Sequence, residues 1–144
     1  VSIGISGYAA WLPSHFSAAE LAEPAISGPA ADPDFDGVPN LAEFAFGTLP
    51  RQGTAIDPSL PRVDLVTTSS GKQRALFFKR PSSRVGQVAY QAQWSSDLKT
   101  WNVFGAEQIL SSEGGVDSVR ILDPQPPVIA PRRLYRLRVT NLNP

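Results

Sequence analysis

A run of acidic residues between positions 32 and 43 carries the clearest chemical signal in the sequence. Counted from Asp32 as position 1, further acidic residues fall at positions 3, 5 and 12, and a glycine falls at position 6. This is the spacing of a twelve-residue calcium loop, in which a tight turn supplies the roughly six to eight oxygens that Ca²⁺ prefers. The expected metal ligands are Asp32, Asp34, Asp36, Val38, Asn40 and Glu43.

The expected ligands differ in what they offer a cation. The three aspartates supply carboxylate oxygens, Val38 offers its main-chain carbonyl, and Glu43 closes the shell with both carboxylate oxygens. Gly37 permits the sharp chain reversal between them. The alternative is an acidic turn without a metal, since Asp-rich turns are common. We favour calcium because three spaced aspartates, a glycine and a glutamate at the proper offset are not common together.

Short helices are expected around this loop. Asn40–Phe46 has the pattern of a short helix, and Gly47 follows it as a left-handed cap. Ser17 and Glu20 form a capping box, which predicts a helix from about residue 17 to residue 23, ended by Pro24. A single helical turn is expected near residues 8–12, and the Pro- and Gly-containing stretch 25–31 is expected to be a loop.

From residue 62 the composition changes to short runs rich in β-branched and aromatic residues, separated by turn signals. The expected strands are Arg62–Thr68, Gln73–Arg80, Gln87–Ser95, Trp101–Phe104, Val116–Asp123 and Arg133–Thr140. Six or seven such strands predict an antiparallel sandwich. The expected fold is therefore mainly β: an Ig- or fibronectin-like antiparallel β-sandwich over residues 62–144, preceded by an arm, short helices and a calcium loop over residues 1–61.

Alternation along two of the strands predicts which side chains enter the core. One expected inward face consists of Val88, Tyr90, Ala92 and Trp94. In the last strand the expected inward residues are Tyr135, Leu137 and Val139, with Arg136 and Arg138 on the opposite face.

Composition limits the classes of protein that the chain can represent. Thirteen basic and thirteen acidic residues give a formal net charge of zero, which argues against a general nucleic-acid or membrane binder. Cysteine is absent, which excludes disulfides and thiol catalysis. No stretch approaches the roughly 18 apolar residues of a membrane-spanning helix. The chain begins at Val1 and has no Met, so we expect a processed product or trimmed chain whose signal peptide has been removed.

The zero net charge is the sum of two unlike halves. Residues 1–61 hold seven acidic residues and one basic residue, whereas residues 62–144 hold six acidic and twelve basic residues. The halves therefore carry −6 and +6. One bound Ca²⁺ would bring the acidic half to about −4.

The acidic loop resembles the thrombospondin type 3 and dockerin-like, EF-hand-type calcium loops of extracellular proteins. It departs from paired EF-hands in having Pro39 at position 8 and no entering helix. Residues 8–140 as a whole resemble a module found near the C-termini of large exported bacterial proteins, in which a calcium loop leads into a β-rich segment. That resemblance implies export and a surface or matrix setting, and it implies no catalytic activity.

Other residues that could do chemistry each have a simpler interpretation. Trp11, Trp94 and Trp101 could form a carbohydrate platform, although aromatic residues this sparse usually serve packing. His15 is the only histidine, and a lone histidine is rarely a catalytic base. The arginines at positions 132, 133, 136 and 138 could bind nucleic acid, form the solvent face of a strand, or contact the acidic half of the same or another chain.

The N-terminal segment Val1–Ser6 alternates apolar and small residues, as a short strand does. It could pair with its own sheet or with an exposed edge of another copy. We therefore expect a non-catalytic, calcium-stabilised extracellular module, a cell-surface, matrix or filament building block that self-associates through this arm. Its expected partners are other copies or a larger exported polypeptide, without nucleic acid or a membrane span. The alternative is a carbohydrate-binding module of an exported enzyme, with a polysaccharide as partner; a catalytic function ranks third.

Overall fold

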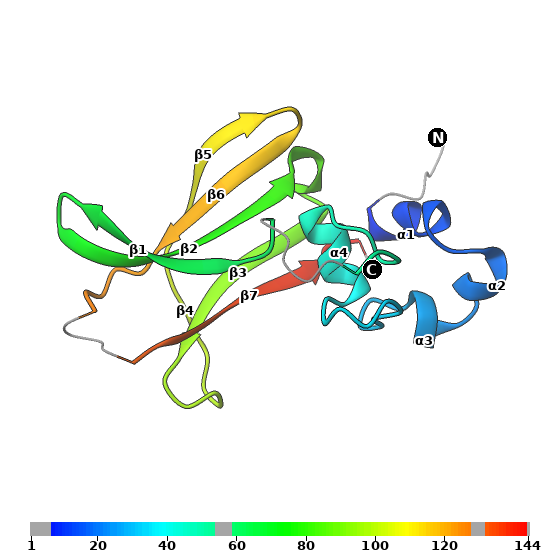
Figure 1. Cartoon of the computed structure of the whole chain (residues 1–144), viewed down its shortest axis with the longest axis horizontal. Helices are drawn as coiled ribbons and strands as arrows, with labels where there is room; N and C mark the ends of the chain where they lie inside the picture. The colour runs from blue at the N-terminus through cyan, green and yellow to red at the C-terminus, as the bar shows by residue number, and fades with distance from the viewer. Residues whose placement is uncertain (1–6, 54–58, 128–131, 144) are drawn as a thin grey trace.

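The computed structural model describes residues 7–53, 59–127 and 132–143. Over these residues, two antiparallel sheets pack face to face, and a group of short helices covers one end (Figure 1). The expectation of a mainly β chain with a short helical segment in front is confirmed. The finer expectation of an Ig- or fibronectin-like topology stays a prediction. The arm at residues 1–6 lies outside the described residues.

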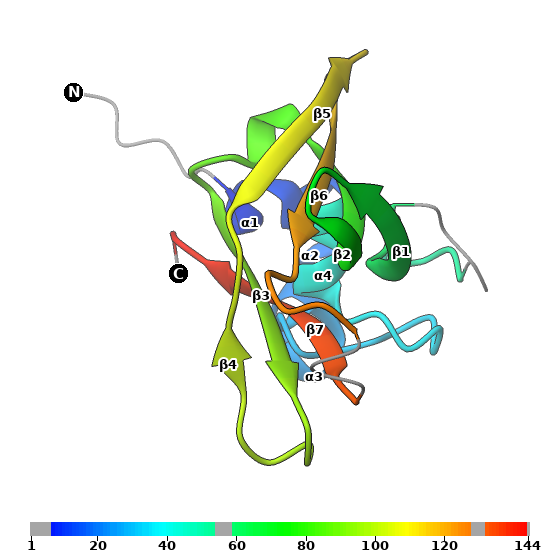
Figure 2. The same cartoon turned by 90° about the vertical axis from the view of Figure 1, so that its left-hand side faces the viewer.

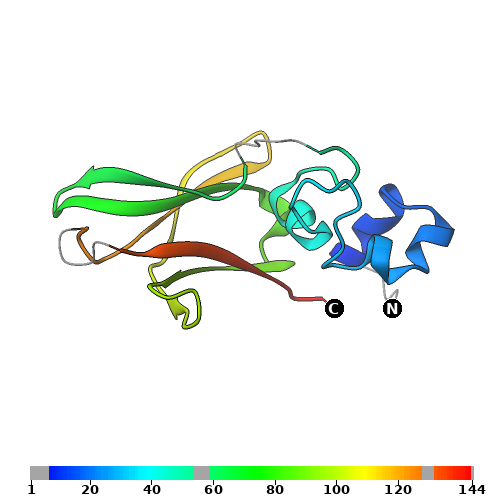
Figure 3. The same cartoon turned by 60° about the horizontal axis from the view of Figure 1, so that its bottom comes forward.

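The first sheet has four strands in the order β1-β2-β6-β5, and the second has three in the order β4-β3-β7. The strands are β1 (Arg62–Thr68), β2 (Gly71–Pro81), β3 (Val88–Ser95), β4 (Asn102–Val103), β5 (Glu107–Glu113), β6 (Val116–Leu122) and β7 (Leu134–Asn141). All pairings between these strands are antiparallel. Figure 3 shows the sheets as two layers, with the helical end to one side.

Strand β5 is the strand that the sequence patterns did not reveal. It lies at the edge of its sheet, most of its side chains are exposed, and a β-bulge interrupts its pairing between Ile109 and Ser111. Because an exposed edge strand has no face that must be apolar, it shows no clear hydrophobic alternation. The other six strands lie where the sequence predicts them, within a few residues at each end.

The helices are all short. They are α1 (Tyr8–Trp11), α2 (Ala18–Leu21), α3 (Pro24–Ser27) and α4 (Asn40–Phe46), with single 3₁₀ turns at Leu12–Ser14 and Ser82–Arg84. The capping box is present at α2, where the Ser17 hydroxyl accepts from the Glu20 N–H and the Glu20 carboxylate accepts from the Ser17 N–H.

The prediction of a loop over residues 25–31 is wrong at its start, because residues 25–27 belong to helix α3. Helix α2 ends at Leu21, earlier than the expected end at residue 23, and Pro24 occupies the first position of α3. Proline favours that position because its fixed φ suits a helix and its missing N–H would have no intrahelical partner there.

The main core lies between the two sheets, and the inward faces predicted from alternation are confirmed. Its residues from the first sheet include Leu76, Phe78, Val119 and Ile121. From the second sheet, Tyr90, Ala92 and Trp94 on β3 face the same core as Tyr135, Leu137 and Val139 on β7. Val88 contributes to a second, smaller cluster with Tyr8, Phe44 and Ala45, which joins the helical segment to the end of the sandwich.

Candidate metal centre

The acidic loop connects α3 to α4 and is closed at its base by main-chain hydrogen bonds. The Asn40 N–H donates to the Ala31 carbonyl at 2.8 Å, and the Leu41 N–H donates to the Pro29 carbonyl at 3.0 Å. Between these points the chain reverses at Gly37, whose φ is +88°. Glycine suits this turn because a left-handed backbone conformation strains residues with a Cβ atom. The base of the loop is thus fixed against the first turn of α4.

The three aspartate side chains converge inside this loop. One carboxylate oxygen from each of Asp32, Asp34 and Asp36 lies within 4.8 Å of the others. Main-chain N–H groups hold them in place: Gly37 donates to Asp32 Oδ2 at 2.9 Å, and Val38 donates to Asp36 Oδ1 at 2.8 Å. Alternate residues of a tight turn thus direct three carboxylates at one point, as the spacing predicts.

Glu43 lies on α4 and is almost fully buried, with 1% of its surface exposed. Neither of its carboxylate oxygens has a hydrogen-bond partner among the described residues, and the same holds for Asp32 Oδ1 and Asp34 Oδ2. A buried carboxylate without a donor or a positive neighbour is costly, because the protein interior solvates a charge far less well than water. The loop and α4 together therefore bury carboxylate oxygens for which the described part of the chain provides no partner.

The pKa values of the cluster reflect the unfavourable burial of these carboxylates. Burial, followed by repulsion from Asp36, Asp34 and Asp32, raises the pKa of Glu43 to about 8. Burial and the neighbouring Asp32 likewise raise the pKa of Asp34 to about 6. Burial also acts to raise the pKa of Asp32, but hydrogen bonds, the one from the Gly37 N–H first among them, outweigh it and lower that pKa. Close carboxylates disfavour one another's charged forms, and a bound cation would reverse that effect.

The two remaining expected ligands occupy different settings. Asn40 is fully buried, and its side-chain amide donates to the carbonyls of Ile26 at 2.8 Å and Gly28 at 3.0 Å, which ties α3 to the start of α4. Its Oδ1 is buried and has no hydrogen-bond partner within the described ranges. Val38 is half-buried, next to Gly37. Metal ligation by Asn40 Oδ1 and by the Val38 carbonyl stays a prediction.

Helix α4 carries Glu43 and is fastened to the sandwich at its other end. Arg84 donates from Nε to the Phe44 carbonyl at 2.7 Å, and its guanidinium lies 3.9 Å from the centre of the Phe44 ring. The Tyr90 hydroxyl donates to the Ala45 carbonyl at 2.6 Å. Phe46 enters the core between the sheets. These contacts satisfy the carbonyls at the C-terminal end of a helix, which otherwise lack donors.

The roles of Tyr90 and Arg84 are missed by sequence patterns. Alternation places Tyr90 in the core, as observed, but it says nothing of the hydroxyl. A tyrosine in place of phenylalanine at a core position was the available signal, because a buried hydroxyl requires a hydrogen-bond partner. Gly53 was also missed: a Cβ atom at this position would lie 3.5 Å from Asp36 Cβ, so its segment lies directly against the loop.

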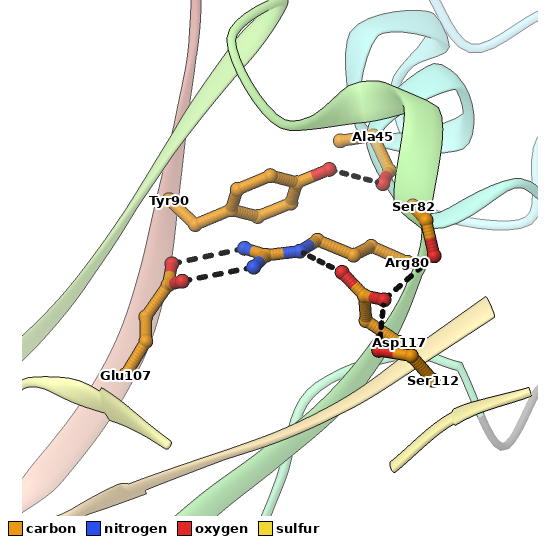
Figure 4. A network of polar contacts seen from close by, with 7 residues as sticks. All are labelled: Ala45, Arg80, Ser82, Tyr90, Glu107, Ser112 and Asp117. Atoms are coloured by element: carbon orange, nitrogen blue, oxygen red, sulfur yellow. Dashed lines mark hydrogen bonds and ion pairs between the residues drawn. The ribbon is translucent and has the colours of Figure 1, made fainter. Parts of the chain in front are cut away.

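Figure 4 shows the partners of another buried charged residue, Arg80, which is 3% exposed. Its guanidinium donates to both oxygens of Glu107, at 3.0 and 2.9 Å, and from Nε to Asp117 at 3.4 Å. Asp117 also accepts from the hydroxyls of Ser82 and Ser112, at 2.6 and 2.8 Å. Every charge in this network has a partner of opposite sign.

Asp123 follows the same rule at the other end of the sandwich. It is fully buried and accepts from Arg133 Nη1 with both oxygens at 3.1 Å, and from the Tyr135 hydroxyl. Of the expected basic run, Arg133 is thus committed to a buried ion pair. Arg136 donates to Gln93 at 2.7 Å.

The three tryptophans expected as a possible sugar platform each have a partner in the fold. The guanidinium of Arg133 lies 3.8 Å from the centre of the Trp94 ring, and that of Arg136 lies 4.0 Å from the centre of the Trp101 ring. Trp11 packs against Phe44 in the smaller core cluster and against the His15 ring at 4.5 Å between centres. Burial and the nearby Arg84 lower the pKa of His15.

Comparison of the chain with models of protein families finds no match, and comparison with curated proteins finds none either. Every helix among the described residues is too short or too polar to cross a membrane. The functional argument therefore rests on the site itself.

Proposed function

We propose that the chain is a non-catalytic, calcium-stabilised extracellular module that serves as a building block of a cell surface, matrix or filament. In this proposal one Ca²⁺ is held by Asp32, Asp34, Asp36, Val38, Asn40 and Glu43. The module associates with other copies through the arm at residues 1–6, or forms part of a larger exported polypeptide.

The observation that carries the proposal is the difference between Glu43 and the other buried charges. Four charged residues are buried among the described residues: Glu43, Arg80, Asp117 and Asp123. The last three have partners of opposite charge. Glu43 instead faces the negative potential of three aspartates and lacks a hydrogen-bond donor. A hard divalent cation would neutralise this cluster and give its oxygens a partner.

A structural role for the metal follows from what Glu43 is attached to. It belongs to α4, whose next three residues contact Arg84, Tyr90 and the main core. A cation held between the loop and Glu43 would therefore fix the helical segment to the end of the sandwich. The loop type, which resembles those of extracellular proteins, suits a setting where calcium is abundant enough to keep the site filled.

The carbohydrate-binding alternative receives no support from the aromatic residues. A sugar ring stacks on an open aromatic face, but arginines lie over Trp94 and Trp101, and Trp11 belongs to a core cluster. A sugar would have to use the opposite faces of these rings or displace the guanidinium groups. The structural module is therefore the function that the geometry supports best.

Thermal unfolding with and without calcium tests the proposal. Calcium at 100 times its dissociation constant should stabilise the native chain by about 2.7 kcal/mol, because only the folded chain forms the site. A chelator should remove this gain. Glu43→Gln should abolish most of the calcium effect, yet raise the melting temperature in chelator, because it removes a buried charge that repels three aspartates.

Glu23→Gln is the matched control, because Glu23 is exposed and lies outside the loop. This variant should keep the full response to calcium. Equal melting temperatures in calcium and in chelator for the native chain would exclude a stabilising metal and leave the cluster as an acidic turn.

A further inference from the structure

The acceptor for the N-terminal arm can be sought among the strand edges of the two sheets. The edge strands are β1 and β5 in one sheet and β4 and β7 in the other. Natural proteins protect edges by shortness, bulges or charge, because unpaired main-chain groups invite another strand. β4 has two residues, and β5 contains a bulge. These two edges are poor acceptors.

Strand β7 has the properties of an acceptor. All eight of its residues pair with β3 on one side. On its outer side, no main-chain hydrogen bond reaches residues 134–141 from the rest of the described chain. Figure 2 shows β7 at the margin of its sheet, next to β3. Its inward side chains are Tyr135, Leu137 and Val139, so a strand added here would extend an apolar face.

An apolar pocket adjoins this edge. It has a volume of about 240 Å³, and its lining residues are Pro29, Ala30, Pro39, Leu41, Ala42 and Val139. Five of the six belong to the stretch around the calcium loop, and Val139 belongs to β7. A strand added beside β7 would bring an apolar side chain next to Val139, where this pocket could receive it.

The place where the arm joins the described chain favours a second copy as its source. A Cβ atom on Gly7 would lie 3.3 Å from the side chain of Asn143, so the root of the arm adjoins the C-terminal end of β7. An arm folded back along its own β7 from this point would run parallel to it. The arm of a second copy can run antiparallel, as every other pairing between strands does here, and antiparallel pairing is somewhat the more stable.

We propose that the arm Val1–Ser6 of one copy adds as an antiparallel strand to the outer edge of β7 in a second copy. Six extended residues span about 20 Å, which matches six of the eight residues of β7. With Ile3 opposite Leu137, Val1 lies opposite Val139 and Ile5 opposite Tyr135. The alternation of the arm then continues the alternation of β7, and Val1 lies at the pocket. This inference rests on the self-association in the proposed function and names its acceptor.

Disulfide trapping tests this pairing in the full chain, which has no cysteine of its own. In the proposed register Ser2 lies opposite Arg138, an exposed residue. A tagged Ser2→Cys chain mixed with an untagged Arg138→Cys chain in calcium should form a disulfide-linked heterodimer on a non-reducing gel. Thr67→Cys in place of Arg138→Cys is the control, because Thr67 is exposed on the competing edge strand β1. Heterodimer yield with Arg138→Cys that is no higher than with Thr67→Cys would overturn the proposal.

The double variant Ser2→Cys with Arg138→Cys separates the two sources of the arm. Pairing between copies yields linked dimers and longer chains, whereas a predominant monomer with an internal disulfide would overturn the proposal in favour of the chain's own arm. Ala30→Trp fills the pocket from an exposed position and should weaken self-association at least tenfold in sedimentation. Ala25→Trp, exposed on α3 and outside the pocket, should leave it unchanged.

The melting temperature in calcium and in chelator, measured on the same preparations, separates failure of this inference from failure of the calcium module. If the chain responds to calcium but shows no trapping at Arg138, the proposed metal site stands and only the assignment of β7 as the acceptor fails. If the chain stays monomeric at all concentrations, both the proposed self-association and the proposed acceptor fail.

Discussion

At the scale of single residues, the protein shows two ways to bury a charge. Arg80 lies within a network of carboxylates and hydroxyls, and its guanidinium carbon is 4.9 Å from the centre of the Tyr90 ring. Glu43 is equally buried but has other carboxylates as neighbours. The first arrangement is complete within the protein, whereas the second requires a cation or a proton. The difference identifies Glu43 as the residue on which the metal proposal depends.

Asp117 provides a pH-dependent test of the complete network. Hydrogen bonds from Ser82 and Ser112, followed by Arg80, lower the pKa of Asp117. Because the folded state favours the carboxylate, its contribution to stability is present above the unfolded pKa of about 3.9 and is lost as the pH falls through the lower folded-state pKa. Asp117→Asn should therefore be less stable by about 1–3 kcal/mol at neutral pH and lose less stability on acidification than the native chain.

Urea unfolding between pH 7 and pH 3, in chelator throughout, measures this difference. Asp64→Asn is the control, because Asp64 is an exposed residue whose partner, Arg62, is also exposed. Parallel stability curves for the native chain and Asp117→Asn would show that the Asp117 charge contributes nothing to folding.

At the scale of elements, α4 is the part that joins the acidic loop to the sandwich. Its N-terminal half carries Asn40 and Glu43, and at its C-terminal end Phe46 packs against the stacked rings of Phe78 and Tyr90, with ring centres 6.0 and 6.1 Å away. The helix ends at Gly47, where a Cβ atom would lie 2.8 Å from Pro81. Seven residues thus connect a surface loop to the main core.

Phe46→Ala should destabilise the chain by about 3–5 kcal/mol, because it leaves a cavity in the core and loosens α4. Phe35→Ala is the matched control: it makes the same chemical change at a position in the acidic loop that is 90% exposed. It should change stability by less than about 0.5 kcal/mol. Chemical denaturation of both variants, each with calcium present, measures the difference. Similar losses for the two would contradict the assigned role of α4.

Much of this architecture is predictable from local patterns. Runs of β-branched and aromatic residues between turn signals locate six strands, and alternation gives the inward faces of two of them. The capping box and Gly47 locate two helices, because each pattern reflects contacts within a short stretch of chain. The convergence of Asp32, Asp34 and Asp36 is predictable for the same reason.

What the sequence does not reveal depends on neighbours distant along the chain. The burial of Glu43 and the hydrogen bond from Tyr90 to Ala45 arise only when α4 packs on the sandwich. The partners of Trp94 and Asp123 are likewise set by the position of Arg133 in the folded chain. Strand β5 forms by pairing with β6, and the side chains of β5 show no alternation that would predict a strand.

At the scale of the whole molecule, the two oppositely charged halves are not joined by ion pairs among the described residues. Arg51 pairs with Glu20 within the acidic half, and the other ion pairs lie within the basic half. The halves meet instead through the apolar core cluster around Phe44 and the hydrogen bonds of Arg84 and Tyr90 to α4. Because no ion pair between the halves neutralises them in the described part of the chain, the acidic half can attract a cation, and the oppositely charged halves of two copies can attract each other.

In this account, a bound cation reduces the negative charge of the helical end and fixes α4 on the sandwich, and the sandwich offers β7 to a second copy. The proposed metal is the central element of this account, because the loop, Glu43 and five of the six residues that line the pocket all lie on the same stretch of chain.

Isothermal titration of the metal-free full chain with calcium tests this claim most directly. The account predicts a binding isotherm with one site per chain, and at least a tenfold weaker isotherm for Glu43→Gln under the same conditions. No heat beyond dilution for the native chain would contradict it.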